Sequence, residues 1–252
     1  MLSKNDIKNI KRLEQKKFRT ENGLFIAEGH KTVEELLGCF NCNLLVATHE
    51  WLDRHKEITA RRIEAVTPDE LKRVSLLQNL QDVLAVLCIP NDSFTLSTAA
   101  DYNLVLALDD IQDPGNLGTI VRIADWFGIR HIICSKGTAD IYNPKAVQAT
   151  MGAVARVKVH YADLARALRE LPENIPVYGT YLNGETIYDT RLSRNGVIIM
   201  GNEGNGISEE VSKAVNCRLF IPNWPSGSIT SESLNVAIAT AIVCSEFRRR
   251  IR

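Results

Sequence analysis

The second half of the chain alternates short apolar runs with amphipathic helical patterns, and no other feature constrains the fold as strongly. The clearest unit begins at residues 104–108, LVLAL, whose wholly apolar character predicts a buried strand. A polar turn over residues 113–116 follows, and apolar residues then recur at helical spacing as far as Gly128, a typical helix stop. Further strands are expected near His131, Val157, Val177, Val197 and Leu219. This alternation predicts an α/β fold in which a parallel sheet has helices on both faces.

Residues 1–95 are expected to form a smaller, separate α/β domain, and residues 96–252 a second domain. The boundary is placed at residues 91–101, because this stretch is polar and rich in Ser and Thr and is therefore typical of a linker. The patterns before it predict helices over about residues 3–17, 32–37 and 68–77, and strands over residues 24–27, 44–48 and 83–89.

Three segments each contain a loop rich in Gly, Asn or Ser that follows a predicted strand. They span residues 109–128, 195–208 and 221–239. Parallel sheets bind ligands at the carboxyl ends of their strands, where such loops lie. For GNEGNG, residues 201–206, the alternative is an ordinary strand-to-helix turn. Its glycines do not follow the G-x-G-x-x-G order and no Lys follows the last one, so nicotinamide and triphosphate sites are disfavoured.

Taken together, the three segments resemble the three signature motifs of the SpoU (TrmH-type) branch of the SPOUT RNA methyltransferases. The N-x-G-x-x-x-R motif is matched by Asn116, Gly118 and Arg122. The G-N-E-G-x-G motif is matched by residues 201–206, and the I-P and S-L-N-V elements by residues 221–222 and 233–236. Any one match is weak, whereas three in the right order form a strong signal.

The resemblance implies an S-adenosylmethionine-dependent RNA 2′-O-ribose methyltransferase that is a homodimer and uses no metal. It also implies a C-terminal trefoil knot, which nothing in the periodicity indicates. The residues that match the family's catalytic positions are Asn116, Arg122, Glu203, Ser233 and Asn235. Those that match its cofactor contacts are Gly201, Ile221 and Leu234.

The role expected of Arg122 follows from the chemistry of its side chain. A guanidinium keeps its proton in proteins, so Arg122 is expected to bind an RNA phosphate and to stabilise the developing alkoxide. The general base stays open. Glu203 is expected to hold Arg122 through a charge-assisted hydrogen bond. The alternative is a helix-surface arginine paired with Asp125 or Glu203.

The first domain resembles the L30e-like substrate-binding domain of many ribosomal RNA methyltransferases in this family. Its first twenty residues contain seven Lys or Arg and two acidic residues, although the whole chain has no net charge. RNA, and ribosomal RNA in particular, is therefore the expected partner. A transfer RNA substrate and a catalytically silent RNA-binding relative are the alternatives. A second basic cluster lies at the end of the sequence and comprises Arg248, Arg249, Arg250 and Arg252. Both an RNA contact and a fraying tail are expected alternatives for this cluster.

The remaining features exclude several other classes of protein. The six cysteines are scattered and three lie in apolar runs, which is typical of reduced core residues in a cytoplasmic protein. Cys39 and Cys42 have C-x-x-C spacing but no second pair, so no metal or redox site is expected there. No apolar run reaches the ~20 residues of a membrane span. Trp224, in an extended loop before Ser233, is expected either to stack on a base or adenine or to be buried by packing.

Overall fold

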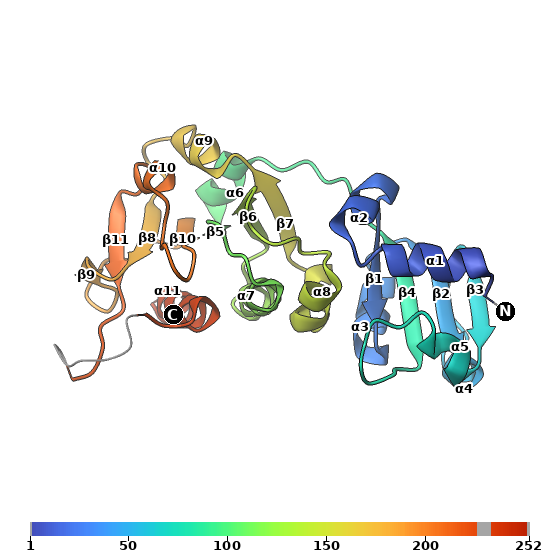
Figure 1. Ribbon diagram of the computed structural model, residues 1–252. Coiled ribbons are helices and arrows are strands. Elements are labelled where there is room, and N and C mark those ends of the chain that lie inside the picture. The colour runs from blue at the N-terminus through green and yellow to red at the C-terminus, as the bar shows by residue number, and fades with distance from the viewer. Residues whose placement is uncertain (1, 226–232, 251–252) are drawn as a thin grey trace. The chain divides into compact units, whose positions relative to one another are not determined.

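A computed structural model describes residues 2–225 and 233–250, and the chain divides into two compact units (Figure 1). The first unit comprises Met1–Asp92 and Asp140–Ala155, and the second comprises Ser93–Ala139 and Arg156–Arg252. The first unit thus includes a segment, residues 140–155, that sequence analysis assigned to the second domain. Its helix α8 (Pro144–Thr150) packs against strand β1 (Leu24–Glu28).

The described part of the first unit is built on a four-stranded sheet with the order β1-β4-β2-β3. Strand β4 (Val83–Cys88) is antiparallel to β1 and to β2 (Cys42–Thr48), whereas β3 (Ile63–Val66) is parallel to β2. The other helical segments of this unit are α1 (Lys4–Arg12), α2 (Lys16–Asn22), α3 (His30–Leu37), α4 (His49–Arg54), α5 (Pro68–Lys72) and the 3-10 turn Ala153–Ala155.

Arg19 explains why the single helix expected over residues 3–17 is wrong and two helices form instead. Its guanidinium donates to the carbonyls of Leu13 at 2.8 Å and Glu14 at 2.7 Å, at the point where the first helix ends. It also donates twice to Asp140 Oδ2, at 2.6 and 2.9 Å. Arg19 is only 2% exposed, so it is a structural residue and does not belong to the basic surface of the first twenty residues.

The described part of the second unit contains a seven-stranded parallel sheet with the order β7-β6-β5-β10-β8-β11-β9. Its strands are β5 (Leu104–Leu108), β6 (His131–Ser135), β7 (Lys158–Ala162), β8 (Val177–Tyr181), β9 (Glu185–Thr186), β10 (Gly196–Met200) and β11 (Cys217–Phe220). The predicted parallel sheet is confirmed, and the two-residue β9 is an addition to the six expected strands.

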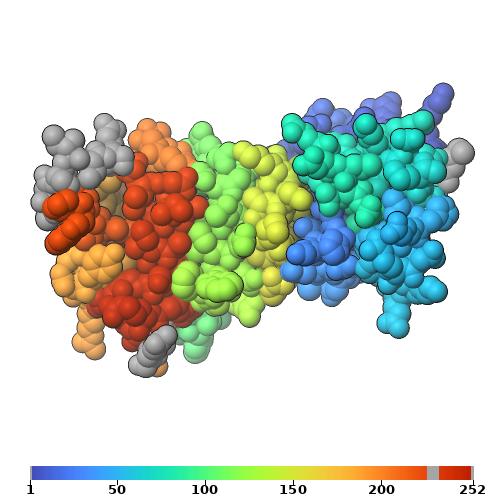
Figure 2. All heavy atoms as spheres, turned by 90° about the horizontal axis from the view of Figure 1, so that it is seen from below, coloured from blue at the N-terminus to red at the C-terminus, as the bar shows by residue number. Residues whose placement is uncertain are grey.

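Helices cover both faces of this sheet, as predicted. They are α6 (Leu96–Tyr102), α9 (Leu164–Arg169) and α10 (Glu209–Ser212) on one face, and α7 (Pro114–Trp126) and α11 (Val236–Arg249) on the other. Val177 of β8 packs in the cluster with the first group. The next residue, Tyr178, points to the opposite face and contacts the ring of Phe247 on α11 edge-on, at 4.9 Å between ring centroids. Helices α7 and α11 pack side by side (Figures 1 and 2).

The linker expected over residues 91–101 is correct only in its first part, because residues 96–102 form α6. Leu96 and Ala100 lie four residues apart, on one side of this helix, and both are buried against the sheet. Tertiary packing therefore outweighs the polar composition of the stretch.

The six cysteines, all within the described residues, are free thiols. Burial raises the pKa of Cys42 to about 11 and that of Cys244 to about 12, so both stay protonated at neutral pH. Cys39 is exposed whereas Cys42 is buried. Across residues 2–225 and 233–250, no helix is both long and apolar enough to span a membrane.

Candidate active site

The parallel sheet gathers the three motif loops at one edge, because each loop follows the carboxyl end of a strand. Strand β10 pairs directly with β5, with Met200 opposite Leu108, so the first and second motif loops start as neighbours. Strands β6 and β7 lie on one side of this pair, and β8, β11 and β9 lie on the other. Such a reversal of strand order is where open α/β sheets bind their ligands.

The first motif opens α7, whose start is set by Asp113. Asp113 Oδ1 accepts the backbone N–H of Asn116 at 2.7 Å, and Pro114 occupies the first helical turn. The polar turn expected before this helix is therefore its N-cap. Asn116 lies in the first turn, with its side chain at the carboxyl edge of the sheet.

The third motif opens α11 in the same way, through Asn235. Asn235 Oδ1 accepts the backbone N–H groups of Ala237 at 3.0 Å and Ile238 at 3.3 Å. Because two N–H groups donate to this atom of the Asn235 side chain, it must be the amide oxygen. The other amide atom is therefore the nitrogen Nδ2, which can only donate. That nitrogen donates to Asn116 Oδ1 at 3.1 Å.

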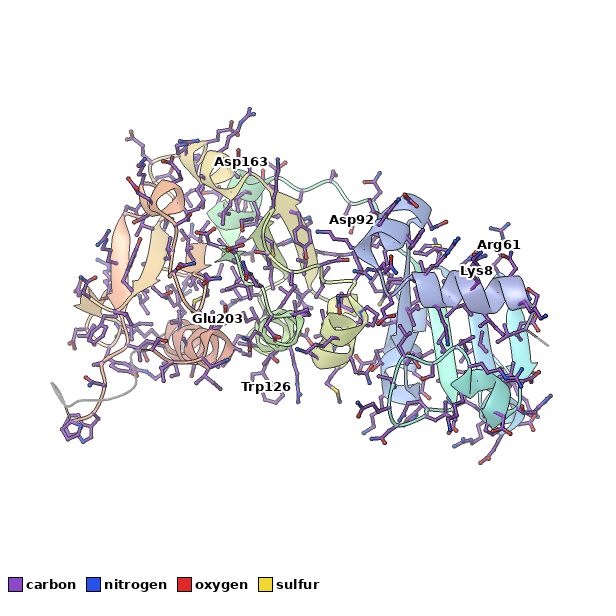
Figure 3. All side chains as sticks on the ribbon, viewed as in Figure 1. Lys8, Arg61, Asp92, Trp126, Asp163 and Glu203 are labelled. Carbon is purple, nitrogen blue, oxygen red and sulfur yellow. The ribbon has the colours of Figure 1, made fainter. Side chains whose placement is uncertain are left out.

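A directional chain of hydrogen bonds follows from this assignment. Because Asn116 accepts at its Oδ1, its Nδ2 is the atom that donates to Glu203 Oε1, at 2.7 Å. The chain Asn235–Asn116–Glu203 thus joins one residue from each motif. Glu203 lies in the loop between β10 and α10 (Figure 3). Three of the five predicted catalytic residues are therefore brought into direct contact.

The second motif forms a tight hairpin. Asn202 and Gly206 exchange two backbone hydrogen bonds of 2.9 Å. A Cβ on Gly201 would lie 2.3 Å from the carbonyl carbon of Gly206, so only glycine fits where the loop closes on itself. Gly206 has a φ of 69°, in the left-handed region.

Arg122 does not make the hydrogen bond to Glu203 that was expected. Glu203 accepts from Asn116 instead, because Arg122 lies six residues further along α7, about 120° around the helix axis. Arg122 is exposed, and within the described residues no hydrogen bond or ion pair involves it. Asp125, its other expected partner, binds Arg156 at 2.9 Å. The paired surface arginine of the alternative interpretation is therefore not observed either.

The remaining predicted residues lie around the same edge of the sheet. Gly201 and Ile221 follow β10 and β11, the two neighbours of β8. Ser233 and Leu234 immediately precede Asn235, the N-cap of α11, and are exposed. Leu234 is 47% exposed and Leu182, just after β8, is 71% exposed. Exposed apolar side chains beside backbone polar groups suit an adenine ring, which needs both kinds of contact.

Two predictions about aromatic and basic side chains change with the structure. Trp224 is 88% exposed, so burial by packing is wrong; residues 226–232 of the same loop lie outside the described residues. Arg248 donates to the carbonyls of Phe127 at 2.7 Å and Gly128 at 3.3 Å. Arg250 donates to the carbonyls of residues 187, 188 and 190. The fraying tail therefore does not describe these two arginines, the RNA contact stays a prediction, and Arg252 lies outside the described residues.

Sequence reasoning missed Asp109 and Asn202, which connect the first two motif loops. Asp109 Oδ2 accepts the backbone N–H of Ser208 at 2.8 Å, and Asn202 Nδ2 donates to the carbonyl of Asp110 at 2.7 Å. Asp109 comes directly after β5, and Asn202 comes two residues after the end of β10. A polar residue at the carboxyl end of a predicted strand is the pattern that could have identified both. Among the described residues, no group of three or more His, Cys, Asp and Glu could hold a metal ion.

Comparison with known protein families agrees with this geometry. Residues 103–245 match the model of the SpoU rRNA methylase family. The chain belongs to that family. Residues 4–85 match a second model, the MRM3-like substrate binding domain.

Similar proteins extend the match over the whole chain. RlmP of Bacillus subtilis, a 23S rRNA (guanosine(2553)-2′-O)-methyltransferase, is 32% identical over 96% of this chain and 95% of its own length. A TrmH-family structure from Porphyromonas gingivalis is 40% identical, with a TM-score of 0.90 over 99% of both chains. An AdoMet-bound rRNA methyltransferase from Sinorhizobium meliloti is 29% identical, with a TM-score of 0.84 over 100% of this chain and 98% of the other.

Proposed function

We propose that this chain is an S-adenosylmethionine-dependent RNA 2′-O-ribose methyltransferase that acts on ribosomal RNA. The observation that carries the proposal is the hydrogen-bonded chain Asn235–Asn116–Glu203, which joins the three motifs of the SpoU family. The full-length similarity to RlmP, named for a 23S rRNA substrate, supports ribosomal RNA. Transfer RNA is the second candidate, because another full-length relative, from Synechocystis, is named a tRNA/rRNA methyltransferase.

The residues around the sheet edge suit S-adenosylmethionine. Gly201 and Ile221 offer backbone groups on either side of β8, and Leu182 and Leu234 offer apolar surface. When bound, this cofactor supplies a methyl group on a positively charged sulfur. The ribose 2′-oxygen would form its bond to the methyl carbon as the S–C bond breaks, which would leave a neutral thioether, and the hydroxyl proton would pass to water.

The polar residues have distinct tasks in this proposal. Glu203 is exposed and uses Oε1 to hold Asn116, which leaves Oε2 to accept a hydrogen bond from a ribose hydroxyl. Arg122, with its exposed guanidinium, binds an RNA phosphate and stabilises negative charge that develops on the 2′-oxygen. Ser233 is an exposed hydroxyl next to Asn235 and offers a further contact to the RNA. A silent relative would not need this complete set.

In this proposal the RNA-binding domain is residues 1–95 and the catalytic domain is residues 96–252, and residues 1–95, which form most of the first unit, supply much of the RNA affinity. Lys4, Lys8 and Lys11 are exposed and lie on one stripe of α1, at the helical spacing i, i+4, i+7. The opposite side of α1 is buried, with Ile10 only 2% exposed. Lys8 and Arg61 project outward from this unit (Figure 3). An exposed basic stripe suits the phosphate backbone.

The proposal includes a homodimer through the outer face of α7 and α11, a trefoil knot at the C-terminal end, and a cytoplasmic location. Trp126 projects away from the sheet (Figure 3) and is 86% exposed. Ile238 on α11 is 55% exposed. Large exposed apolar side chains on neighbouring helices are typical of an interface. Light scattering on the parent and on Trp126→Glu tests the dimer: the parent is expected at twice the chain mass and the variant at the chain mass. A monomeric parent would contradict it.

Two experiments test the function. Calorimetry on chelator-treated protein should show binding of S-adenosylmethionine and its demethylated product with Kd on the order of micromolar. Absence of heat with both compounds would contradict the cofactor assignment. Mapping of 2′-O-methyl groups in total RNA from a deletion strain and its parent should then show one ribosomal position lost. A loss confined to transfer RNA would select the second candidate.

A further inference from the structure

We propose that Asn202 is a positioning residue whose side-chain amide sets the place of Glu203 in the chain Asn235–Asn116–Glu203. This inference rests on the proposed function, because it assigns Asn202 a task in the same site. The Asn202 side chain uses both ends of its amide. Its Oδ1 accepts the N–H groups of Gly204 at 2.9 Å and Asn205 at 3.1 Å, and its Nδ2 donates to the carbonyl of Asp110 at 2.7 Å.

The two hydrogen bonds that Asn202 Oδ1 accepts stabilise the conformation of the hairpin of residues 202–206 from within. Together with the paired backbone bonds between Asn202 and Gly206, they set the shape of the loop that carries Glu203. They do not set its direction relative to α7. The orientation of the hairpin depends on the hydrogen bonds that join it to the rest of the fold. One of these bonds lies before Glu203 in the sequence and one lies after it.

The anchor before Glu203 is the bond from Asn202 Nδ2 to Asp110. Asp110 is itself held in an unusual backbone conformation, with a φ of 59° that is rare for a residue with a side chain. Its N–H donates to Ser135 Oγ at 2.9 Å, and its carboxylate fills the space beside Gly137, where a Cβ would lie 2.2 Å from Oδ1. Strained backbone of this kind persists only where neighbours hold it.

The anchor after Glu203 is the bond from the Ser208 N–H to Asp109, which is 5% exposed. Asp109 and Asp110 begin the loop that leads to Asn116, so both anchors connect the second motif to the first. The 2.7 Å contact between Asn116 and Glu203 is therefore the result of a shared frame. Removal of the second anchor would require a change at Asp109, which is buried. The hydrogen bond from Asn202 Nδ2 to Asp110 can be removed while the buried residues and the hairpin are kept.

The substitution Asn202→Asp isolates this anchor. Aspartate keeps an oxygen to accept from Gly204 and Asn205, so the hairpin persists, but it has no N–H to donate and places a negative oxygen against the Asp110 carbonyl. The matched control is Asn205→Asp, which makes the same chemical change in the same loop. Asn205 occupies the unspecified position of the motif and is exposed.

Single-turnover methylation at saturating RNA and cofactor provides the first readout. We expect Asn202→Asp to lower the rate by about tenfold to a hundredfold, the scale of a small misplacement of reacting groups, with RNA affinity unchanged. Asn205→Asp should keep the parental rate within about twofold. In a Glu203→Ala background, Asn202→Asp should have no further effect beyond about twofold, because the group it positions is gone. An equal loss with and without Glu203 would overturn the proposal, as would parental activity of Asn202→Asp.

A second readout does not depend on activity. The side-chain amide protons of Asn116, assigned by comparison with Asn116→Ala, should exchange slowly in the parent and in Asn205→Asp, because Glu203 protects them. They should exchange rapidly in Asn202→Asp. If this protection changes as expected while the parent methylates no RNA, the positioning role stands and the proposed function fails. Unchanged protection in Asn202→Asp would overturn the positioning role by itself.

Discussion

The guanidinium of Arg122 is exposed on α7, on a different side of the helix from Asn116. The nearest acidic side chain along its own face, Asp125, is engaged by Arg156. An arginine kept apart from carboxylates retains its full capacity to bind an anion from outside the chain. This availability, more than any contact seen in the structure, is the physical basis for its proposed role.

The substitution Arg122→Ala is expected to lower single-turnover methylation by about 10² or more, the scale for removal of one preorganised donor. Arg122→Lys should recover little, because a point charge does not reproduce a planar, bidentate group. Cofactor affinity should stay unchanged in both. Arg130→Ala, at another exposed arginine near the same helix, is the control and should keep the parental rate. Full activity of Arg122→Ala would show that Arg122 is only a surface residue.

A pH-dependent contribution to stability comes from Asp6. Its carboxylate completes the capping box of α1 and receives two hydrogen bonds from Arg62, at 2.9 and 3.0 Å. Arg62 holds the pKa of Asp6 well below its usual range. A carboxyl group whose pKa is lower in the folded state stabilises the fold above its unfolded pKa of about 3.9, and this contribution is lost as the pH falls below that value.

We therefore expect Asp6→Asn to lower the free energy of unfolding at pH 7 by about 1 kcal/mol, the typical value of a cap. The difference from the parent should shrink as the pH falls below about 4. Urea denaturation at several pH values measures it. Asp53→Asn, at an exposed aspartate, should change stability by less than about 0.5 kcal/mol at any pH. A difference that does not depend on pH would contradict the assignment.

At the scale of elements, the C-terminal end of α11 binds two other segments: the end of α7 through Arg248, and residues 187–190 through Arg250. Arg248 donates to the carbonyl of Phe127, the C-cap of α7, and to that of Gly128, the next residue. A positive charge at a helix C-terminus also interacts favourably with the helix dipole. Because α7 carries Asn116 and Arg122, the last turn of α11 supports the helix that carries the candidate site.

Removal of the Arg248 hydrogen bonds should measurably reduce stability. Arg248→Ala is expected to lower the free energy of unfolding by about 1.5–3 kcal/mol, the range for hydrogen bonds to charged groups. Arg249→Ala is the control, because Arg249 is largely exposed and pairs with Glu246, which Arg250 also binds. The effect of Arg249→Ala should stay below about 1 kcal/mol. Equal effects of the two variants in urea denaturation would show that Arg248 does not cap α7.

At the scale of the whole molecule, the two units are interleaved in sequence. Residues 140–155 leave the chain of the second unit and pack with the first, where Asp140 binds Arg19 and α8 packs against β1. Deletion of residues 1–95 would therefore uncover the face of α8 that β1 covers. Surface substitutions are the cleaner test of RNA binding by the first unit.

The triple variant Lys4→Gln, Lys8→Gln, Lys11→Gln should weaken RNA binding and leave cofactor binding unchanged. The slope of log affinity against log salt should become shallower by about 0.7–0.9 for each RNA phosphate that the variant no longer neutralises. A control variant that removes three exposed charges, Arg166 and Arg169 on α9 and Lys213 at the C-cap of α10, should bind RNA with the parental slope. Equal slopes in all three proteins would show that the stripe of α1 is only solvated surface.

The sequence located the candidate site better than it described the bonds within it. Asn116, Glu203 and Asn235 were identified by motif, and the structure places them in one chain of hydrogen bonds. The partner of Glu203 was wrong, because a motif gives spacing along a helix but not which side chain faces a loop 87 residues away. Asn202 was missed because its partner is a backbone carbonyl, which no residue pattern marks.

By itself the sequence determined the parallel α/β fold, the six main strands of the second unit and the three polar loops, because periodicity and turn residues are local properties of the chain. Tertiary structure decided the rest. It turned a polar stretch into α6, buried Arg19 and used Arg248 and Arg250 to bind backbone carbonyls. Each of these outcomes depends on groups that are distant in sequence, whose burial and hydrogen bonding outweigh local preference once the chain is packed.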